Sequence, residues 1–112
     1  MHQLGQIVIF DTTGEDEQFF ADWIEANPVG YVANLGRGAN RRSPVKLHEA
    51  VCIFMTSEAV AKGGFIGGDF YKACSLDGQV LTQWVQQGYA EGHWGEPSDD
   101  RRFCHPGLIP QH

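Results

Sequence analysis

A basic segment in an acidic chain is the first candidate for chemistry. The chain has 8 lysines and arginines against 14 aspartates and glutamates, which gives a net charge of −6. Half of the basic residues stand in one segment with no acid between them: Arg37, Arg41, Arg42 and Lys46. Guanidinium groups match the geometry of phosphates and carboxylates. The segment therefore predicts an anion-binding loop. The alternative is a solvated loop whose arginines pair with the acidic residues 15–17. Such exposed ion pairs are common on protein surfaces and add little stability.

Four further residues complete the predicted ligand-binding set: Tyr31, Asn34, His48 and Lys72. Asn34 and His48 flank the basic segment, and the ring of Tyr31 could stack on a nucleic-acid base. A histidine beside arginine or lysine is favoured in its neutral form until an anion binds. We therefore expect binding at residues 36–48 to be salt-sensitive and to strengthen as the pH falls towards about 6.

Histidines and cysteines form a second group that could hold a metal: His48, Cys52, Cys74, Cys104 and His105. Zinc takes four such ligands, typically with one pair close in sequence. The usual Cys-x-x-Cys pair is missing, and His48 and Cys52 would lie roughly 13 Å apart on an extended strand. The alternative role for Cys52 and Cys74 is burial in the core, where a free cysteine behaves as a small apolar residue. We therefore predict no zinc and no cofactor.

A hydrolytic centre is the enzyme alternative. Asp69 and Glu49 could hold a magnesium ion, His48 could act as general base, and Lys72 or Arg37 could stabilise charge. Asp69 and Lys72 would point to opposite faces of a regular strand. The chain has no nucleophile elbow, phosphate-binding loop or His-Glu-x-x-His motif. A nuclease or another phosphate-transforming hydrolase stays open as an alternative.

Composition limits the setting in which this chemistry takes place. A chain of 112 residues fits one domain. It has no apolar run of about 18 residues, so we expect no membrane span, and its first residues do not resemble a signal peptide. Three cysteines, an odd number, favour reduced thiols in the cytoplasm over a disulfide framework. The negative net charge argues against binding of nucleic acid over the whole surface.

The elements that must position these residues follow from apolar periodicity. Alternating or β-branched runs predict strands at 6–11, 29–35, 45–54 and 69–74, with a loop at 36–44. In the third strand, Val45 and Leu47 would share one face, and Lys46 and His48 the other. Helical spacing of aromatic and aliphatic residues predicts helices within 12–28 and 76–88, the second with Ser75 as its N-cap.

This order of elements predicts an α+β fold. We expect a four-stranded, mostly antiparallel or mixed sheet with two helices on one face. The domain would span residues 1–88, and residues 89–112 would form an irregular tail packed on it. Two helices on one face leave the other face uncovered, so we predict a homodimer or a larger homo-oligomer.

Three segments resemble a small prokaryotic domain of unknown function. They are Gly30-Tyr31-Val32-Ala33-Asn34-Leu35-Gly36-Arg37, Leu47-His48-Glu49-Ala50-Val51-Cys52 and Tyr71-Lys72-Ala73-Cys74, followed by the helix that carries Trp84. The resemblance covers residues 30–85. It is to stand-alone bacterial proteins carried by mobile gene pools such as integron cassettes, and similar segments occur beside defence or nuclease-like proteins. The family pattern often ends in Cys-x-x-Cys, where this chain has Cys104-His105. The resemblance implies no established activity.

Three classes of function remain open. The first is a small intracellular binding module that holds an anionic ligand, single-stranded nucleic acid or an acidic protein partner at the basic segment. The second is the phosphate-transforming hydrolase or nuclease that uses His48 and Lys72. The third is a structural protein that assembles through an uncovered sheet face.

Overall fold

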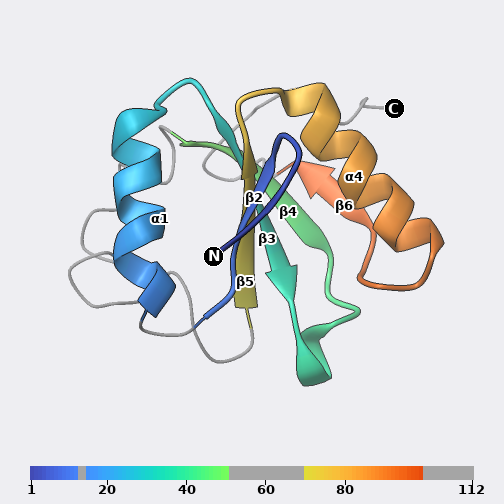
Figure 1. Cartoon of the computed structure of the whole chain (residues 1–112). Helices are drawn as coiled ribbons and strands as arrows, with labels where there is room; N and C mark the ends of the chain where they lie inside the picture. The colour runs from blue at the N-terminus through green and yellow to red at the C-terminus, as the bar shows by residue number, and fades with distance from the viewer. Residues whose placement is uncertain (13–14, 51–69, 100–112) are drawn as a thin grey trace.

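One mixed sheet forms the centre of the molecule (Figure 1). The computed structural model describes residues 1–12, 15–50 and 70–99. Within them, six strands lie side by side in the order β1 (His2–Leu4), β2 (Ile7–Phe10), β5 (Phe70–Ser75), β3 (Tyr31–Gly36), β4 (Val45–Glu49) and β6 (Pro97–Asp99). Neighbouring strands are antiparallel except for β4 and β6, which are parallel. The α+β class and the mixed sheet are confirmed.

Two α-helices of the described residues pack on this sheet: α1 (Glu15–Ala26) and α4 (Gly78–Ala90). Acidic residues fill the first turn of α1, where the helix dipole favours negative charge. The carboxylate of Asp77 caps α4 by accepting hydrogen bonds from the backbone amides of Gln79 and Val80. The predicted N-cap, Ser75, is wrong: it ends β5, and its hydroxyl accepts a hydrogen bond from the amide of Asp77.

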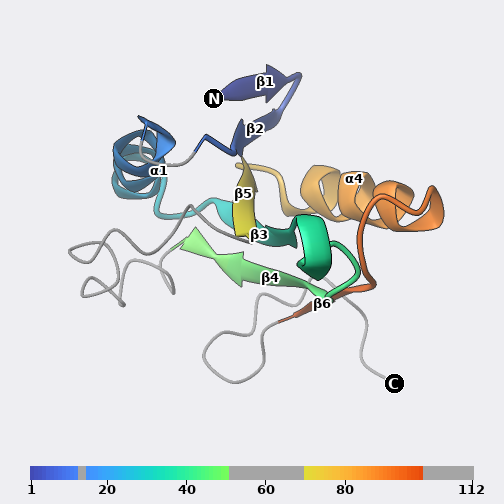
Figure 2. The same cartoon turned by 90° about the horizontal axis from the view of Figure 1, so that it is seen from below.

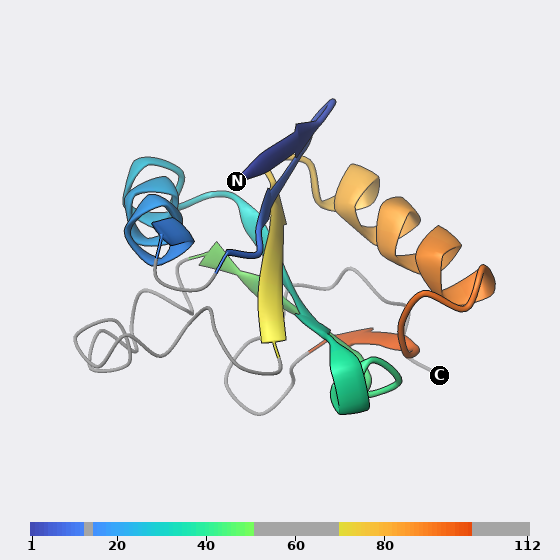
Figure 3. The same cartoon turned by 60° about the horizontal axis from the view of Figure 1, so that its bottom comes forward.

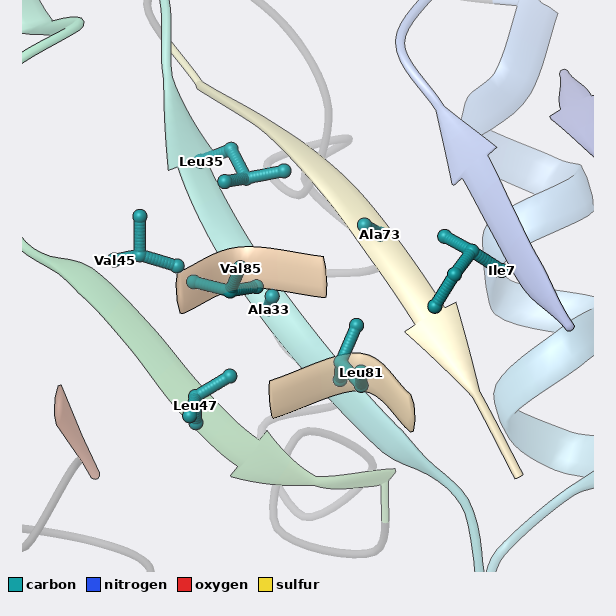
Figure 4. Packing of buried hydrophobic residues seen from close by; sticks show 8 residues of the cluster. All are labelled: Ile7, Ala33, Leu35, Val45, Leu47, Ala73, Leu81 and Val85. Atoms are coloured by element: carbon teal, nitrogen blue, oxygen red, sulfur yellow. The ribbon is translucent and has the colours of Figure 1, made fainter. Parts of the chain in front are cut away.

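The two helices cover opposite faces of the sheet, so their prediction on one face is wrong. On one face, Phe20 and Ile24 of α1 pack with Phe10, Val32 and Cys74. Figure 2 shows the two helices on opposite sides of the sheet. On the α4 side, Leu81 and Val85 pack with the strand residues that alternate with the first set, among them Ile7, Ala33, Leu35 and Ala73 (Figure 4). Consecutive strand residues face opposite ways, and Val32-Ala33 and Ala73-Cys74 are all fully buried. Both faces of β3 and β5 must therefore be covered.

This arrangement also removes the reason given for an oligomer, because neither face of the central strands is left without a helix. The homo-oligomer stays a prediction. A light-scattering mass of 12.4 kDa, that of one chain, would exclude it.

The predicted strand count is wrong because both edge strands were missed. The three residues of β1 are all exposed and pair with β2 through the backbone, so no alternating apolar pattern marks the strand. β6 lies inside the segment 89–112, which was predicted to be irregular, and pairs with β4 (Figure 3). Three residues beginning with a proline are too few to show a period. Residues 51–54 of the third predicted strand, and 100–112 of the tail, lie outside the described residues.

No helix in the described ranges is long and apolar enough to cross a membrane.

Candidate functional site

The sheet register gathers four of the predicted site residues on the face that α1 covers. Lys72 of β5 pairs with Asn34 of β3, and Asn34 pairs with Lys46 of β4. The three therefore form one row across three neighbouring strands. Their parity is that of the residues packed against α1. His48 belongs to the adjacent row, opposite Val32. The predicted placement of Lys46 and His48 on the same face of β4 agrees with this register.

Lys72 has the most unusual environment of the four. Its ammonium group donates a hydrogen bond to Oδ1 of Asn34. Burial, which disfavours the charged amine, lowers the pKa of Lys72 from 10.5 to about 8, and the nearby Cys74 and Glu17 oppose this change. Glu17 comes from the first turn of α1. A pKa of about 8 leaves the amine mostly protonated at pH 7, so Lys72 acts as a poorly hydrated cation.

The other members of this face differ in exposure. Lys46 is exposed, whereas Asn34 and His48 are half-buried. Glu49 follows His48 on β4 and by strand alternation points to the α4 face. The sheet therefore separates Glu49 from His48 and Lys72, and it divides the hydrolytic group predicted from the sequence. Asp69, the fourth member of that group, lies outside the described residues.

Arg37 leaves the predicted anion-binding loop and joins strands instead. Its Nη2 donates hydrogen bonds to the backbone oxygens of Asp11, at 2.9 Å, and Phe70, at 3.3 Å. Its guanidinium carbon lies 5.2 Å from the centre of the Tyr71 ring. These contacts connect the ends of β2, β3 and β5. Arg37 therefore does not face a ligand together with the lysines, as the predicted anion-binding loop would require.

Three more predicted residues also lie apart from the lysine row. Tyr31 is half-buried and packs against the core cluster under α4, on the face opposite Asn34 and Lys72. Arg41 and Arg42 are exposed in the turn after the short 3₁₀ helix η1 (Gly38–Asn40). Arg42 lines a separate pocket. The basic segment is therefore continuous in sequence but divided in space.

Cys74 is fully buried, as expected from the sequence. Burial raises the pKa of its thiol, and it lies two residues beyond Lys72 on the same face of β5. One group near the site residues was missed in the sequence, Asp11. Its carboxylate lies 3.3 Å from Nε2 of His2, and its backbone oxygen accepts a hydrogen bond from Arg37. It was missed because the strand carrying His2 was not predicted.

The proposed metal ligands cannot be assembled from the part of the chain that the structure describes. Cys52, Cys104 and His105 lie outside it, and Cys74 has a free, buried thiol. Within the described ranges, no three His, Cys, Asp or Glu residues gather as a metal site would require. No family model, curated protein or solved structure matches the chain. The resemblance to mobile-cassette proteins thus stays a prediction.

Proposed function

We propose that the protein is a binding module for a small anion bearing phosphate or carboxylate groups. The ligand binds on the α1 face of β5, β3 and β4, where Lys46 and Lys72 supply the charge and Asn34 and His48 flank them. The single observation that supports this proposal is the row Lys72, Asn34 and Lys46 across three paired strands. Neighbouring strands lie about 4.8 Å apart, so two lysines on either side of β3 start about 10 Å apart and their long side chains can converge on one anion.

The state of Lys72 adds a thermodynamic reason. Its amine is charged at neutral pH although burial disfavours that charge. An anion beside the amine would restore the electrostatic interaction that water no longer supplies. Binding should therefore raise the pKa of Lys72 and take up protons at pH values near 8.

The charge of the whole chain favours a small ligand over a polyanion. With a net charge of −6, the protein repels long nucleic acids except where cations are concentrated. Tyr31, which was expected to stack on a base, lies on the opposite face of the sheet from the lysines. A compact anion needs neither a stacking partner nor a long basic track.

Calorimetric titration with inorganic phosphate tests the proposal. Wild type, Lys46→Ala and Arg41→Ala are compared at low and physiological salt. Arg41 is the matched control, since it is an exposed cation of the same basic segment but lies outside the lysine row. We expect Lys46→Ala to weaken binding about tenfold, Arg41→Ala to change it less than twofold, and added salt to weaken wild type. Equal affinities of wild type and Lys46→Ala would refute the site.

The pH dependence gives a second readout. Because the anion pairs with the charged amine, affinity should fall as the pH rises through about 8, where Lys72 loses its proton. Lys72→Met should bind weakly and lose this dependence. Phosphate itself loses a proton near neutral pH, so the comparison with Lys72→Met isolates the lysine. Identical pH profiles for the two proteins would exclude Lys72 from the site.

A further inference from the structure

A pocket of about 470 Å³ lies away from the lysine row. Its walls come from the end of α4, from the connection between α4 and β6, and from the loop before β4. The residues that matter for its chemistry are Arg42, Pro44, Tyr89, Trp94, Gly95 and Glu96. Figure 3 shows the connection beside the loop that follows η1. The volume falls within the range of about 300–1,000 Å³ that is common for small-molecule sites.

Close packing holds the two loops of this pocket together. A Cβ atom on Gly95 would overlap the backbone oxygens of Arg42 and Ser43, so only glycine permits this approach. The amide of Val45 also donates a hydrogen bond of 3.0 Å to the backbone oxygen of Glu96. The two charged residues of the pocket, Arg42 and Glu96, are therefore fixed relative to each other through their backbones.

The aromatic wall is equally well fixed. The indole N–H of Trp94 donates a hydrogen bond of 2.7 Å to the backbone oxygen of Val85. Its ring lies 4.8 Å from that of Trp84 and covers Gly88, where a Cβ would overlap it. Tyr89 also lines the pocket, with 47% of its surface exposed. The ring of Tyr89 is therefore accessible to a ligand that enters the pocket.

These groups together define the ligand that the pocket would suit. Aromatic rings stack on planar heterocycles and tolerate any of the bases. Arginine pairs with phosphate through its fork of N–H donors. A glutamate accepts hydrogen bonds from ring or exocyclic N–H groups, as carboxylates do from cytosine N4. A flat ring with N–H donors at one edge and an anion at the other would satisfy all three.

We propose that this pocket binds a nucleotide unit. The base stacks against Tyr89 and Trp94, its N–H edge faces Glu96, and its phosphate pairs with Arg42. The site is independent of the lysine row, so either proposal can fail without the other.

Intrinsic tryptophan fluorescence provides the assay, because Trp94 belongs to the pocket. Wild type is titrated with adenosine monophosphate, adenosine and inorganic phosphate. We expect saturable binding of the monophosphate, and at least tenfold weaker binding of the two fragments. A 5′-phosphorylated tetranucleotide is titrated in parallel. Tighter binding of the mononucleotide identifies a free nucleotide, and tighter binding of the tetranucleotide identifies a strand terminus.

The variants use a matched pair of neighbouring arginines. Arg42→Ala should weaken binding of the monophosphate about tenfold, and Arg41→Ala, outside the pocket, less than twofold. Tyr89→Ala should weaken it to a similar degree, and circular dichroism checks that this exposed substitution leaves the fold intact. Lys46→Ala should have no effect here, although we expect it to weaken phosphate binding at the sheet face about tenfold. Absence of saturable monophosphate binding, or equal effects of the two arginine variants, would overturn the proposal.

Discussion

Replacing Lys72 by methionine should stabilise the protein at pH 7, although it removes a hydrogen bond. Methionine has nearly the length of lysine and no charge, so the space beneath α1 stays filled. The substitution removes a buried ammonium group whose pKa burial lowers from 10.5 to about 8. It also leaves Oδ1 of Asn34 without the donor that Lys72 supplies.

The size of the effect follows from these two changes. The difference between the two pKa values corresponds to roughly 3 kcal/mol of unfavourable free energy while the folded amine is charged. The unpaired oxygen of half-buried Asn34 costs about 1 kcal/mol. The variant should therefore be about 2 kcal/mol more stable than wild type at pH 7.

The pH dependence has a definite sign. Between about pH 8 and pH 10.5 the unfolded lysine keeps its proton and the folded one does not, so wild type gains stability as the pH rises. Cys74 acts in the opposite direction. Burial raises the pKa of its thiol, so at high pH the unfolded chain ionises this thiol first and the folded protein loses stability. Both proteins contain Cys74, so their difference reports mainly Lys72, together with the smaller effect that the lysine's charge has on the Cys74 pKa. The advantage of the variant should shrink to about zero by pH 10.

Urea unfolding under reducing conditions, followed by circular dichroism at pH 7, 8, 9 and 10, measures this difference. Lys46→Met is the control, since Lys46 lies in the same row but is exposed, and it should change stability by less than about 0.5 kcal/mol at any pH. Parallel pH profiles for wild type and Lys72→Met would refute the reasoning. A less stable Lys72→Met at pH 7 would show that the buried cation supports the fold.

Three further substitutions test the framework around the sites. Asp16→Asn should cost about 2 kcal/mol in urea unfolding at pH 7. The carboxylate of this fully buried residue accepts charge-assisted hydrogen bonds from two backbone amides and from the terminal ammonium of Met1, and an asparagine lacks the charge and turns an N–H donor towards the ammonium. Burial alone would raise its pKa, but hydrogen bonds and the amino terminus lower it on balance, so the loss should fade as the pH falls below about 4. Gly88→Ala should cost about 1–3 kcal/mol and weaken the near-ultraviolet signal of the Trp84–Trp94 pair, since its methyl group overlaps Trp94. Arg37→Met should cost about 2 kcal/mol yet leave phosphate affinity unchanged in calorimetry, because Arg37 binds backbone oxygens.

The part of the fold that the sequence predicts is the part with a visible apolar period. β2, β3, β5 and both helices lie within three residues of their predicted bounds, because each buries a face against a core cluster. β4 starts as predicted but ends at Glu49, whereas its predicted end is residue 54. β1 is fully exposed and depends on backbone pairing, and β6, although Pro97 is buried, is too short to show a period. The sides taken by the helices follow from β5 inserting between β2 and β3, a pairing between residues far apart in sequence.

The candidate site was predictable to a similar degree. Strand alternation alone places Lys46 and His48 on one face, as expected. The neighbours Asn34 and Lys72 join them only through the register of β3 with β4 and β5, which no local pattern encodes. Arg37 departs because it follows the last residue of β3, and its long side chain reaches carbonyl oxygens that only the folded chain presents.

The different placement of arginine and lysine follows from how their charges are hydrated. Guanidinium is weakly hydrated and has five donors in a planar fork, so Arg37 can exchange water for two backbone oxygens and a tyrosine ring. An ammonium group is strongly hydrated and loses this hydration when it is buried. The pKa of Lys72 is therefore lowered. The arginine thus holds strands together, while the lysine keeps an unfavourable charge beneath a helix. Departures of this kind are typical of functional sites. Within the row of Lys72, Asn34 and Lys46, Lys72 is therefore the residue whose charge a bound anion would stabilise most.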